Sequence, residues 1–206
     1  MTGRRRARRG EGDALREEIL AAAVGLLAET GSEEALSIRA VAARVGVTPP
    51  SIYLHFADKE SLVEAVCLEA FEDFDSRLAA AAAGREDPIE VLEAIGRAYV
   101  AFALERPEQY RYMFMRRPPA GLSEPTPAEL ETIDGLRLVI AAVQSAQRAG
   151  LIDPAKDPLV VTYALWCTTH GLAALLIAKP HFPWGDRQAL AEAAVELAIN
   201  GVLTRS

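Results

Sequence analysis

The chain has few cysteines and lacks the short motifs of metal and nucleotide chemistry. Cys67 and Cys167 are its two cysteines among 206 residues, too few for a disulfide framework and suited to a reducing compartment. No C-x-x-C, H-E-x-x-H or glycine-rich phosphate loop occurs in the sequence. We therefore expect no bound metal, no cofactor and no enzymatic activity.

Signals for export and for membrane insertion are also weak. Five arginines occupy the first nine residues, but Gly-Glu-Gly-Asp follows them instead of the apolar stretch that a secretory signal needs. One stretch, 158–178, lacks Asp, Glu, Lys and Arg over 21 residues, close to the length that spans a bilayer. It contains three threonines and a histidine, and no second such stretch exists. A buried or interface helix in a cytoplasmic protein is therefore the favoured interpretation, with a single-span membrane sensor as an alternative.

The hydrophobic pattern is helical almost throughout. Half of the residues are hydrophobic and a quarter are charged, which excludes an intrinsically disordered chain. Apolar residues recur at three-to-four spacing, and no alternating run is flanked by hairpin turns, so the sequence predicts an all-α fold of about nine helices. The expected starts of the first helices are Asp13, Ser37, Thr48, Asp58 and Asp87. A short aromatic piece at 110–115, a mobile proline-containing loop at 116–127 and a helix at about 128–149 are expected next, followed by helices at about 156–178 and 186–203.

The charge is divided unevenly along the chain. A net charge of −7 and a pI near 5.1 are, as averages, unfavourable for a nucleic-acid-binding protein. Residues 1–62 nevertheless hold nine basic and nine acidic side chains, whereas the remaining residues hold thirteen and twenty. The negative charge therefore belongs to the C-terminal part. We predict a flexible basic arm (1–13), an N-terminal domain (14–62) and an acidic C-terminal domain (63–206).

The most informative segment is 37–59, with the sequence SIRAVAARVGVTPPSIYLHFADK. Two short predicted helices meet at Gly46, a residue type that accepts the backbone conformation of a tight turn, and Ala42 is small enough for close helix approach. This is the pattern of a helix-turn-helix, whose second helix enters the major groove of DNA while the first crosses the backbone.

This segment resembles the TetR family of bacterial transcriptional regulators. The similarity lies in Ser-Ile-Arg at 37–39, Gly-Val-Thr at 46–48 and Tyr-x-His-Phe-x-x-Lys at 53–59, within about 15–68. Pro50 and Leu54 depart from the residue types common at these positions, so base specificity does not carry over. The resemblance implies contacts to double-stranded DNA from Ser37, Arg39, Thr48, Pro50, Ser51, Tyr53, Leu54, His55 and Lys59. The arginine-rich arm is either a solubilising tail or an extension that follows DNA.

A second resemblance occurs at Trp166-x-x-x-His170-Gly171, which is similar to the Trp-His-Gly type of C-terminal domain of a subset of TetR-like proteins. In the family the last two helices pair with their copies in a second subunit. This implies a homodimer through the helices at about 156–178 and 186–203. The remaining helices would enclose a small-molecule pocket. Its expected wall residues are Tyr99, Phe102, Tyr110, Met113, Phe114, Trp166, Thr169 and His170.

Two hypotheses of different classes follow from these features. In the favoured one, a homodimeric repressor binds a roughly palindromic operator and is released by an unknown small-molecule effector that tilts the helix beginning at Asp58. In the alternative, the chain is a helical-bundle enzyme or carrier of small molecules with a vestigial helix-turn-helix. Salt-dependent DNA binding distinguishes the two, because only a protein that contacts phosphates releases counterions on binding.

Overall fold

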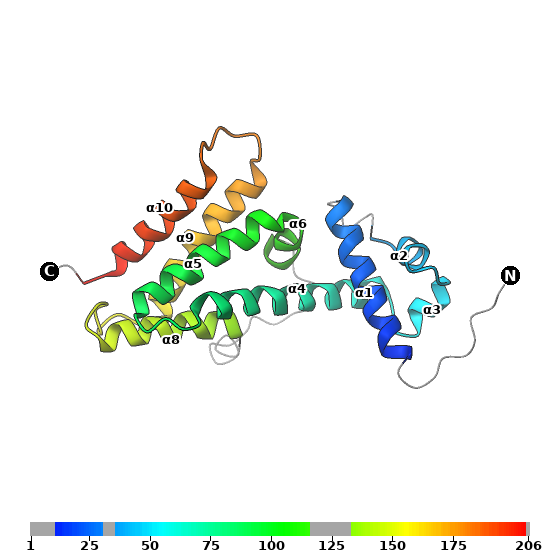
Figure 1. The fold of residues 1–206 in the computed structure, drawn as a ribbon, viewed down its shortest axis with the longest axis horizontal. Coiled ribbons are helices and arrows are strands. Elements are labelled where there is room, and N and C mark those ends of the chain that lie inside the picture. The colour runs from blue at the N-terminus through cyan, green and yellow to red at the C-terminus, as the bar shows by residue number, and fades with distance from the viewer. Residues whose placement is uncertain (1–10, 31–35, 116–132, 205–206) are drawn as a thin grey trace. The chain divides into compact units, whose positions relative to one another are not determined.

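The computed structural model describes residues 11–30, 36–115 and 133–204, and the chain is mainly helical within them. Nine α-helices and one π-helical turn follow one another without a strand in these residues, which confirms the predicted all-α fold (Figure 1). The chain separates into two compact units, Met1–Ala70 and Phe71–Ser206. The division falls inside a helix, on the C-terminal side of the predicted boundary at 62.

Three helices and the beginning of a fourth build the first unit. They are α1 (Glu11–Thr30), α2 (Ile38–Val45), α3 (Pro49–Tyr53) and α4 (Lys59–Ala82), of which α1 packs on α2 and α2 on α3. Their apolar positions meet in one core, and burial of each large side chain contributes about 1.5–3 kcal/mol. The largest fully buried side chains of this core are Ile19, Leu36, Val41, Ile52, Leu62, Val63 and Val66.

Side-chain caps define two helix starts in the first unit. The Ser37 hydroxyl accepts a hydrogen bond from the backbone N–H of Ala40 at 3.2 Å, at the start of α2. At the start of α4, Asp58 Oδ1 accepts from the Ser61 N–H at 2.7 Å, and the Asp58 N–H donates to the Ser61 hydroxyl at 3.1 Å. The expected cap at Asp13 is wrong, because α1 already begins at Glu11. An acidic residue inside the first turn still interacts favourably with the helix dipole.

The turn between α2 and α3 depends on Gly46. Its φ of 79° and ψ of 30° lie in the left-handed region, and its N–H and that of Val47 both reach the Ala42 carbonyl at 2.9 Å. A Cβ added here would meet no atom within 4 Å. Backbone conformation is therefore the reason for glycine at this position, and space is not.

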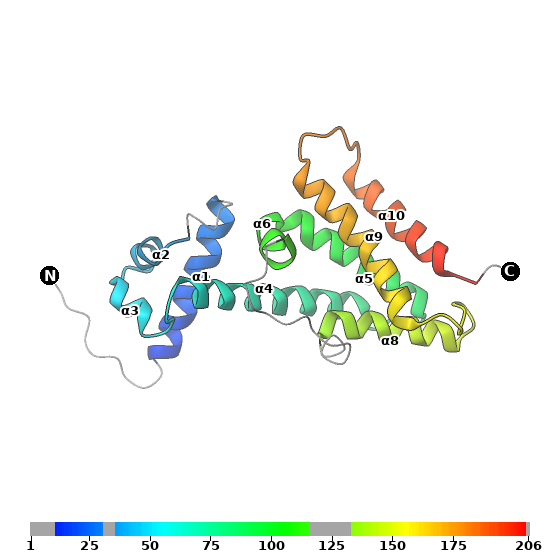
Figure 2. The same ribbon diagram turned by 180° about the vertical axis from the view of Figure 1, so that it is seen from behind.

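The second unit contains the end of α4 and all later helices. These are α5 (Pro88–Glu105), α6 (Pro107–Tyr110), the π-helical turn η1 (Arg111–Met115), α8 (Asp134–Arg148), α9 (Pro158–Ala178) and α10 (Arg187–Val202). α5 packs against α8, α9 and α10, and the consecutive helices α9 and α10 lie side by side (Figure 2). The aromatic segment expected at 110–115 is found at this place, and its residues 111–115 form the π-helical turn η1. Residues 116–132, which include the predicted mobile loop, lie outside the described residues.

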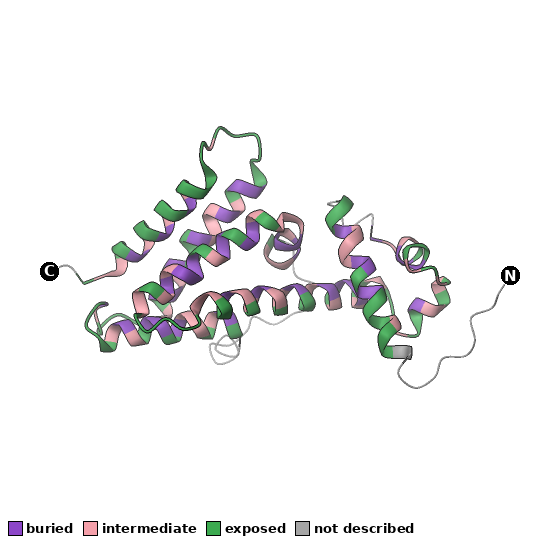
Figure 3. Cartoon of the chain, in the orientation of Figure 1, coloured by how far each residue is buried: buried purple, intermediate pink, exposed green. Residues whose placement is uncertain are grey.

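The long uncharged helix α9 has two different sides. By length and composition it is the one helix in the described part of the chain that could cross a membrane. One side is buried against the core through residues such as Leu165 and Ala173, whereas Val160 and Leu175 are more than half exposed. Figure 3 shows a similar division along α10, where buried and exposed residues alternate along the helix. Burial in a helical core thus explains the lack of charge on one side of α9.

We expect Gly46→Ala to lower the free energy of unfolding by about 1–2 kcal/mol, because alanine would have to adopt a left-handed backbone. Gly46→Asn should recover part of this loss, since asparagine tolerates that region better. Urea unfolding followed by circular dichroism measures both changes. Equal stability of the three proteins would contradict the requirement for a positive φ at this turn.

Candidate functional site

The helix-turn-helix presents an exposed surface at α3 and the residues that follow it. Leu54 is 82% exposed and Tyr53 is 54% exposed, although both side chains have large apolar bodies. Pro50 is exposed and His55 is half-buried, while Ile52 between them is fully buried and anchors the helix. Adjacent exposed apolar side chains of this size are typical of a surface that binds another molecule.

The hydroxyl groups of the predicted DNA-binding set take different positions. Thr48 Oγ1 and Ser51 Oγ lie 3.1 Å apart in an exposed pair at the start of α3. Thr48 occupies the N-cap position of α3, as expected. Its side chain, however, makes no capping hydrogen bond to the backbone. Ser37 uses its hydroxyl oxygen to cap α2, and Lys59 is the first residue of α4.

The two arginines of α2 differ in their ion pairing. Arg44 forms a bidentate ion pair with Glu29 of α1 at 2.7 Å for each N–H···O contact, and this pair raises the pKa of Arg44 and lowers that of Glu29. Gly25 makes room for it, because a Cβ there would stand 2.9 Å from a guanidinium nitrogen. Arg39 is exposed in the first turn of α2 and forms no ion pair with any residue that the structure describes. Its charge is therefore available to a phosphate.

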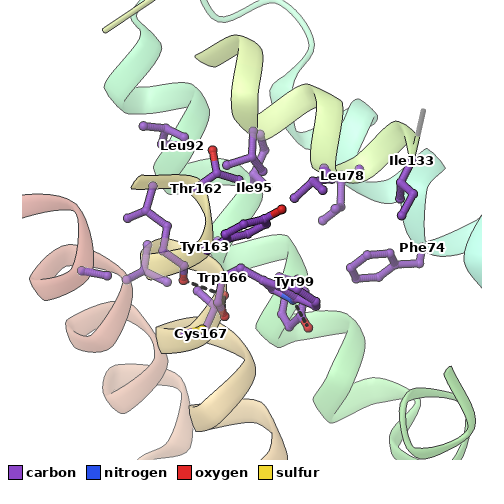
Figure 4. Close-up of a pocket in the computed structure, with 18 of the residues that line it drawn as sticks. Phe74, Leu78, Leu92, Ile95, Tyr99, Ile133, Thr162, Tyr163, Trp166 and Cys167 are labelled. Atoms are coloured by element: carbon purple, nitrogen blue, oxygen red, sulfur yellow. Dashed lines mark hydrogen bonds between the residues drawn. The ribbon is translucent and has the colours of Figure 1, made fainter. Parts of the chain in front are cut away.

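The second unit contains a cavity of about 620 Å³ whose wall comes from α4, α5, η1, α8, α9 and α10 (Figure 4). This volume is within the range of small-molecule binding sites. In Figure 4, Tyr163 extends from α9 toward Leu78 of α4, and Trp166 lies beside Tyr99. The wall residues are Phe71, Phe74, Asp75, Leu78, Leu92, Ile95, Gly96, Tyr99, Phe114, Ile133, Gly135, Leu136, Val139, Thr162, Tyr163, Leu165, Trp166, Cys167, Thr169, Val195, Ala198 and Ile199.

Half of the predicted pocket residues line this cavity. The four that do are Tyr99, Phe114, Trp166 and Thr169. The four that lie outside its described wall are Phe102, Tyr110, Met113 and His170. Phe102 and Tyr110 are instead fully buried in the core, and Met113 packs against it. An aromatic residue at helical spacing is as typical of a core as of a pocket, so periodicity alone could not separate the two groups.

The residues of the Trp-x-x-x-His pattern join a hydrogen-bonded cluster beside the cavity. Trp166 Nε1–H donates to the Tyr99 hydroxyl at 3.1 Å, and the hydroxyls of Tyr99 and Tyr110 are 3.0 Å apart. His170 Nδ1 lies 2.6 Å from the Tyr110 hydroxyl and 2.9 Å from that of Tyr99. The four groups can form one chain of hydrogen bonds, in which the indole donates to Tyr99, Tyr99 donates to Tyr110, and Tyr110 donates to His170 Nδ1. The imidazole is then neutral and an acceptor at Nδ1.

Burial keeps this cluster uncharged. It raises the pKa of Tyr99 to about 12 and raises the pKa of Tyr110 far above its usual range. Desolvation also lowers the pKa of His170, which favours the neutral imidazole. Because its members are neutral and satisfy one another, the cluster lies between the helices without the cost of an unpaired charge.

Sequence reasoning missed several wall residues, among them the polar residues Asp75 and Thr162. Asp75 lies four residues after Phe71 and three before Leu78, in register with the apolar side of α4. The Thr162 hydroxyl is fully buried and has no hydrogen-bond partner among the described residues. A charged residue in register with an apolar helix side was the available signal for Asp75. Nothing in the sequence distinguishes Thr162 from the other threonines of α9.

The Asp75 carboxyl is held at the cavity by the start of α8. The backbone N–H of Gly135 favours its ionised form, and a Cβ at residue 135 would stand 2.6 Å from Asp75 Oδ1. Glycine is therefore what allows the carboxyl to approach the helix backbone. Desolvation, with a further contribution from the charge of Asp134, raises the pKa of Asp75.

A helix-turn-helix unit with an exposed second helix, followed by a helical unit that encloses an apolar cavity, defines a transcriptional regulator of the helix-turn-helix class. The described residues contain no group of three or more His, Cys, Asp or Glu that could hold a metal ion. Residues 19–66 match the family model for bacterial regulatory proteins of the tetR family, and residues 92–198 match the tetracyclin repressor-like C-terminal domain. The chain belongs to the TetR family. Its Trp-His-Gly subtype stays a prediction.

Solved structures with the same fold cover nearly the whole chain. A protein of unknown function from Rhodococcus sp. RHA1 is 27% identical with a TM-score of 0.78, over 92% of this chain and 96% of that one. A TetR family transcription regulator from Marinobacter aquaeolei VT8 is 25% identical with a TM-score of 0.71, over 96% and 100%. A TetR-family regulator from Pectobacterium atrosepticum is 25% identical with a TM-score of 0.71, over 97% and 99%. No curated protein matches the sequence.

We expect the pH dependence of stability to contain a contribution from His170. Its pKa is lowered in the folded chain, so the unfolded chain binds more protons below about pH 6.5, and the free energy of unfolding falls on acidification. Thermal unfolding of the wild type and His170→Gln at a series of pH values measures this contribution. His181→Gln, which replaces an exposed histidine of the same unit, is the control. An identical pH dependence in the wild type and His170→Gln would refute the assignment.

Proposed function

We propose that this protein is a cytoplasmic repressor that binds a roughly palindromic operator as a homodimer and is released by a small molecule. The observation that carries the proposal is the continuity of α4. Its first residue, Lys59, is one of the predicted phosphate contacts, while Phe71, Phe74, Asp75 and Leu78 on the same helix line the cavity. A ligand that acts on the cavity end of this helix would act on its other end as well, because both ends belong to one continuous hydrogen-bonded helix.

The DNA-binding part of the proposal rests on the exposed side chains of the first unit. Arg39 has a guanidinium without an ion pair among the described residues, which suits a phosphate contact. Tyr53 and Leu54 offer apolar surface that contributes little to the core, and an aliphatic side chain in the major groove can contact a thymine methyl group. Thr48 and Ser51 add hydroxyl groups that can contact phosphate or base edges.

The dimer part of the proposal rests on the exposed side of α9. Val160, Ala164, Thr168 and Leu175 are exposed and recur at spacings of four or seven residues, which places them along one stripe of the helix. Gly171 belongs to the same stripe, and a Cβ added to it would meet nothing within 4 Å. Such a surface of small and apolar residues allows a second helix to approach closely.

Helix α10 offers a matching stripe. Ala193, Leu197 and Gly201 recur every four residues and are exposed, with Leu197 at 72%. A Cβ at Gly201 would also meet nothing within 4 Å. Two adjacent helices that both expose apolar residues support an interface of four helices with a second copy of the chain, because burying such a surface between identical subunits removes it from water.

We expect Arg39→Ala to weaken binding to the DNA that flanks the gene by about tenfold and to reduce the slope of log K against log salt concentration by about 0.9. Fluorescence anisotropy at several salt concentrations measures both quantities. Arg44→Ala is the matched control, since it removes one positive charge from the same helix. That charge is already neutralised by Glu29, so the salt slope should stay unchanged. Equal effects of the two substitutions would overturn the role of Arg39.

We expect Leu197→Glu to convert the dimer into a monomer, because the substitution places a charge in the centre of the proposed interface. Sedimentation velocity gives the oligomeric state. Ala141→Glu introduces the same charge at an exposed position of α8, outside the two stripes, and should leave the dimer intact. A dimer that persists in Leu197→Glu would place the interface elsewhere.

A further inference from the structure

We propose that the cavity of the second unit binds a lipophilic organic monocation whose positive charge pairs with the carboxylate of Asp75. This inference rests on the proposed ligand-responsive function and adds the chemical class of the ligand. Three features of the wall carry it: a single positioned carboxylate, a continuous aromatic surface beside it, and the sign of the charges around it.

Asp75 is the one charged side chain among the described wall residues. Its position is built into the fold, since its Oδ1 lies 2.6 Å from where a Cβ of residue 135 would stand, and only the absence of a side chain at Gly135 allows this approach. The carboxyl has no basic partner among the described residues. Asp134, whose charge acts on it, is also acidic and forms its own ion pair with Arg137 at 2.6 Å.

The charge of Asp75 is costly in the empty cavity. Desolvation and the neighbouring Asp134 both raise its pKa, so the ionised form at neutral pH is destabilised relative to the unfolded chain. A cation in contact with the carboxylate would compensate this cost on binding. An anion at the same place would add a third negative charge, with no positively charged side chain among the described wall residues to balance it.

The rest of the wall favours an organic cation over a hydrated metal ion. Six of the wall residues are aromatic, and two of them lie on α4 near Asp75 in sequence: Phe71 comes one helical turn before it and Phe74 directly precedes it. Phe114 contacts both of them, with ring centroids 5.4 and 5.6 Å away, and Phe74 contacts Tyr99 at 5.2 Å. Aromatic faces attract cations, and a large apolar surface stabilises the organic body of the ligand. A small hydrated ion would gain neither contribution.

The test compares two ions of nearly the same shape and opposite charge, tetraphenylphosphonium and tetraphenylborate, by isothermal titration calorimetry. We expect the wild type to bind the cation at least about tenfold more tightly than the anion, and Asp75→Asn to lose about tenfold in affinity for the cation. Equal affinities for the two ions in the wild type, or an unchanged cation affinity in Asp75→Asn, would overturn the proposal.

Two further variants separate charge pairing from a loss of folding. Glu90→Gln removes a carboxylate from an exposed position of α5 and should leave the affinity for the cation unchanged. Gly135→Ala keeps Asp75 but displaces its carboxyl, so the cation affinity should fall between those of the wild type and Asp75→Asn. Asp75→Asn itself should melt at a higher temperature than the unliganded wild type at neutral pH, because a carboxyl with a raised pKa destabilises the folded chain when it ionises.

DNA binding by the same samples distinguishes this inference from the proposed function. If the protein binds DNA through Arg39 but does not discriminate between the two ions, the ligand class is wrong and the repressor remains. If the cation binds through Asp75 and no DNA binding is found, the ligand class stands and the repressor is wrong. Release of DNA by tetraphenylphosphonium in the wild type, but not in Asp75→Asn, would support both.

Discussion

The architecture of the second unit depends on the hydrogen-bonded cluster of Trp166, Tyr99, Tyr110 and His170. These groups come from α9, α5 and α6. Their hydrogen bonds therefore connect the middle of α9 to its neighbours and fix the orientation of α9 about its own axis. With that rotation set, Thr162, Trp166 and Thr169 line the cavity, and the stripe that contains Val160 and Leu175 is exposed. One set of polar contacts on an otherwise apolar helix therefore determines both the cavity wall and the surface available to a second subunit.

Stability and the proposed ligand binding make opposite demands on the cavity. An apolar residue in place of Asp75 would remove a carboxyl whose pKa is raised by burial, and a partner for the Thr162 hydroxyl would remove an unsatisfied group. The chain keeps both polar groups in the wall of an apolar cavity. Under the proposed function this arrangement is useful, because a ligand that compensates the cost at Asp75 would bind with a free energy that depends on the ligand's chemistry and not on apolar area alone.

The helices and several of their first and last residues could be predicted from the sequence, because helix caps depend on local chemistry. Ser37, Asp58 and Asp87 cap the helices that they were expected to begin, and Gly46 ends α2. Asp13 was mistaken for a cap because several acidic residues near the start of α1 are equally compatible with a first turn. The helix-turn-helix followed from the same short-range information, since it is formed by residues close together in sequence.

The cavity could be predicted only in part. Tyr99 and Phe102 both lie on the apolar side of α5 and both belong to the same core cluster, yet only Tyr99 also lines the cavity. The difference depends on which helix packs over each residue.

The sequence by itself determined that the chain is helical, that residues 37–59 form a helix-turn-helix and that α9 carries no charge. Only the tertiary structure decided which apolar side chains enclose a cavity and that Asp75 lies in its wall. Periodicity reports the side of a helix that is covered, whereas a cavity exists where helices far apart in sequence leave space between them.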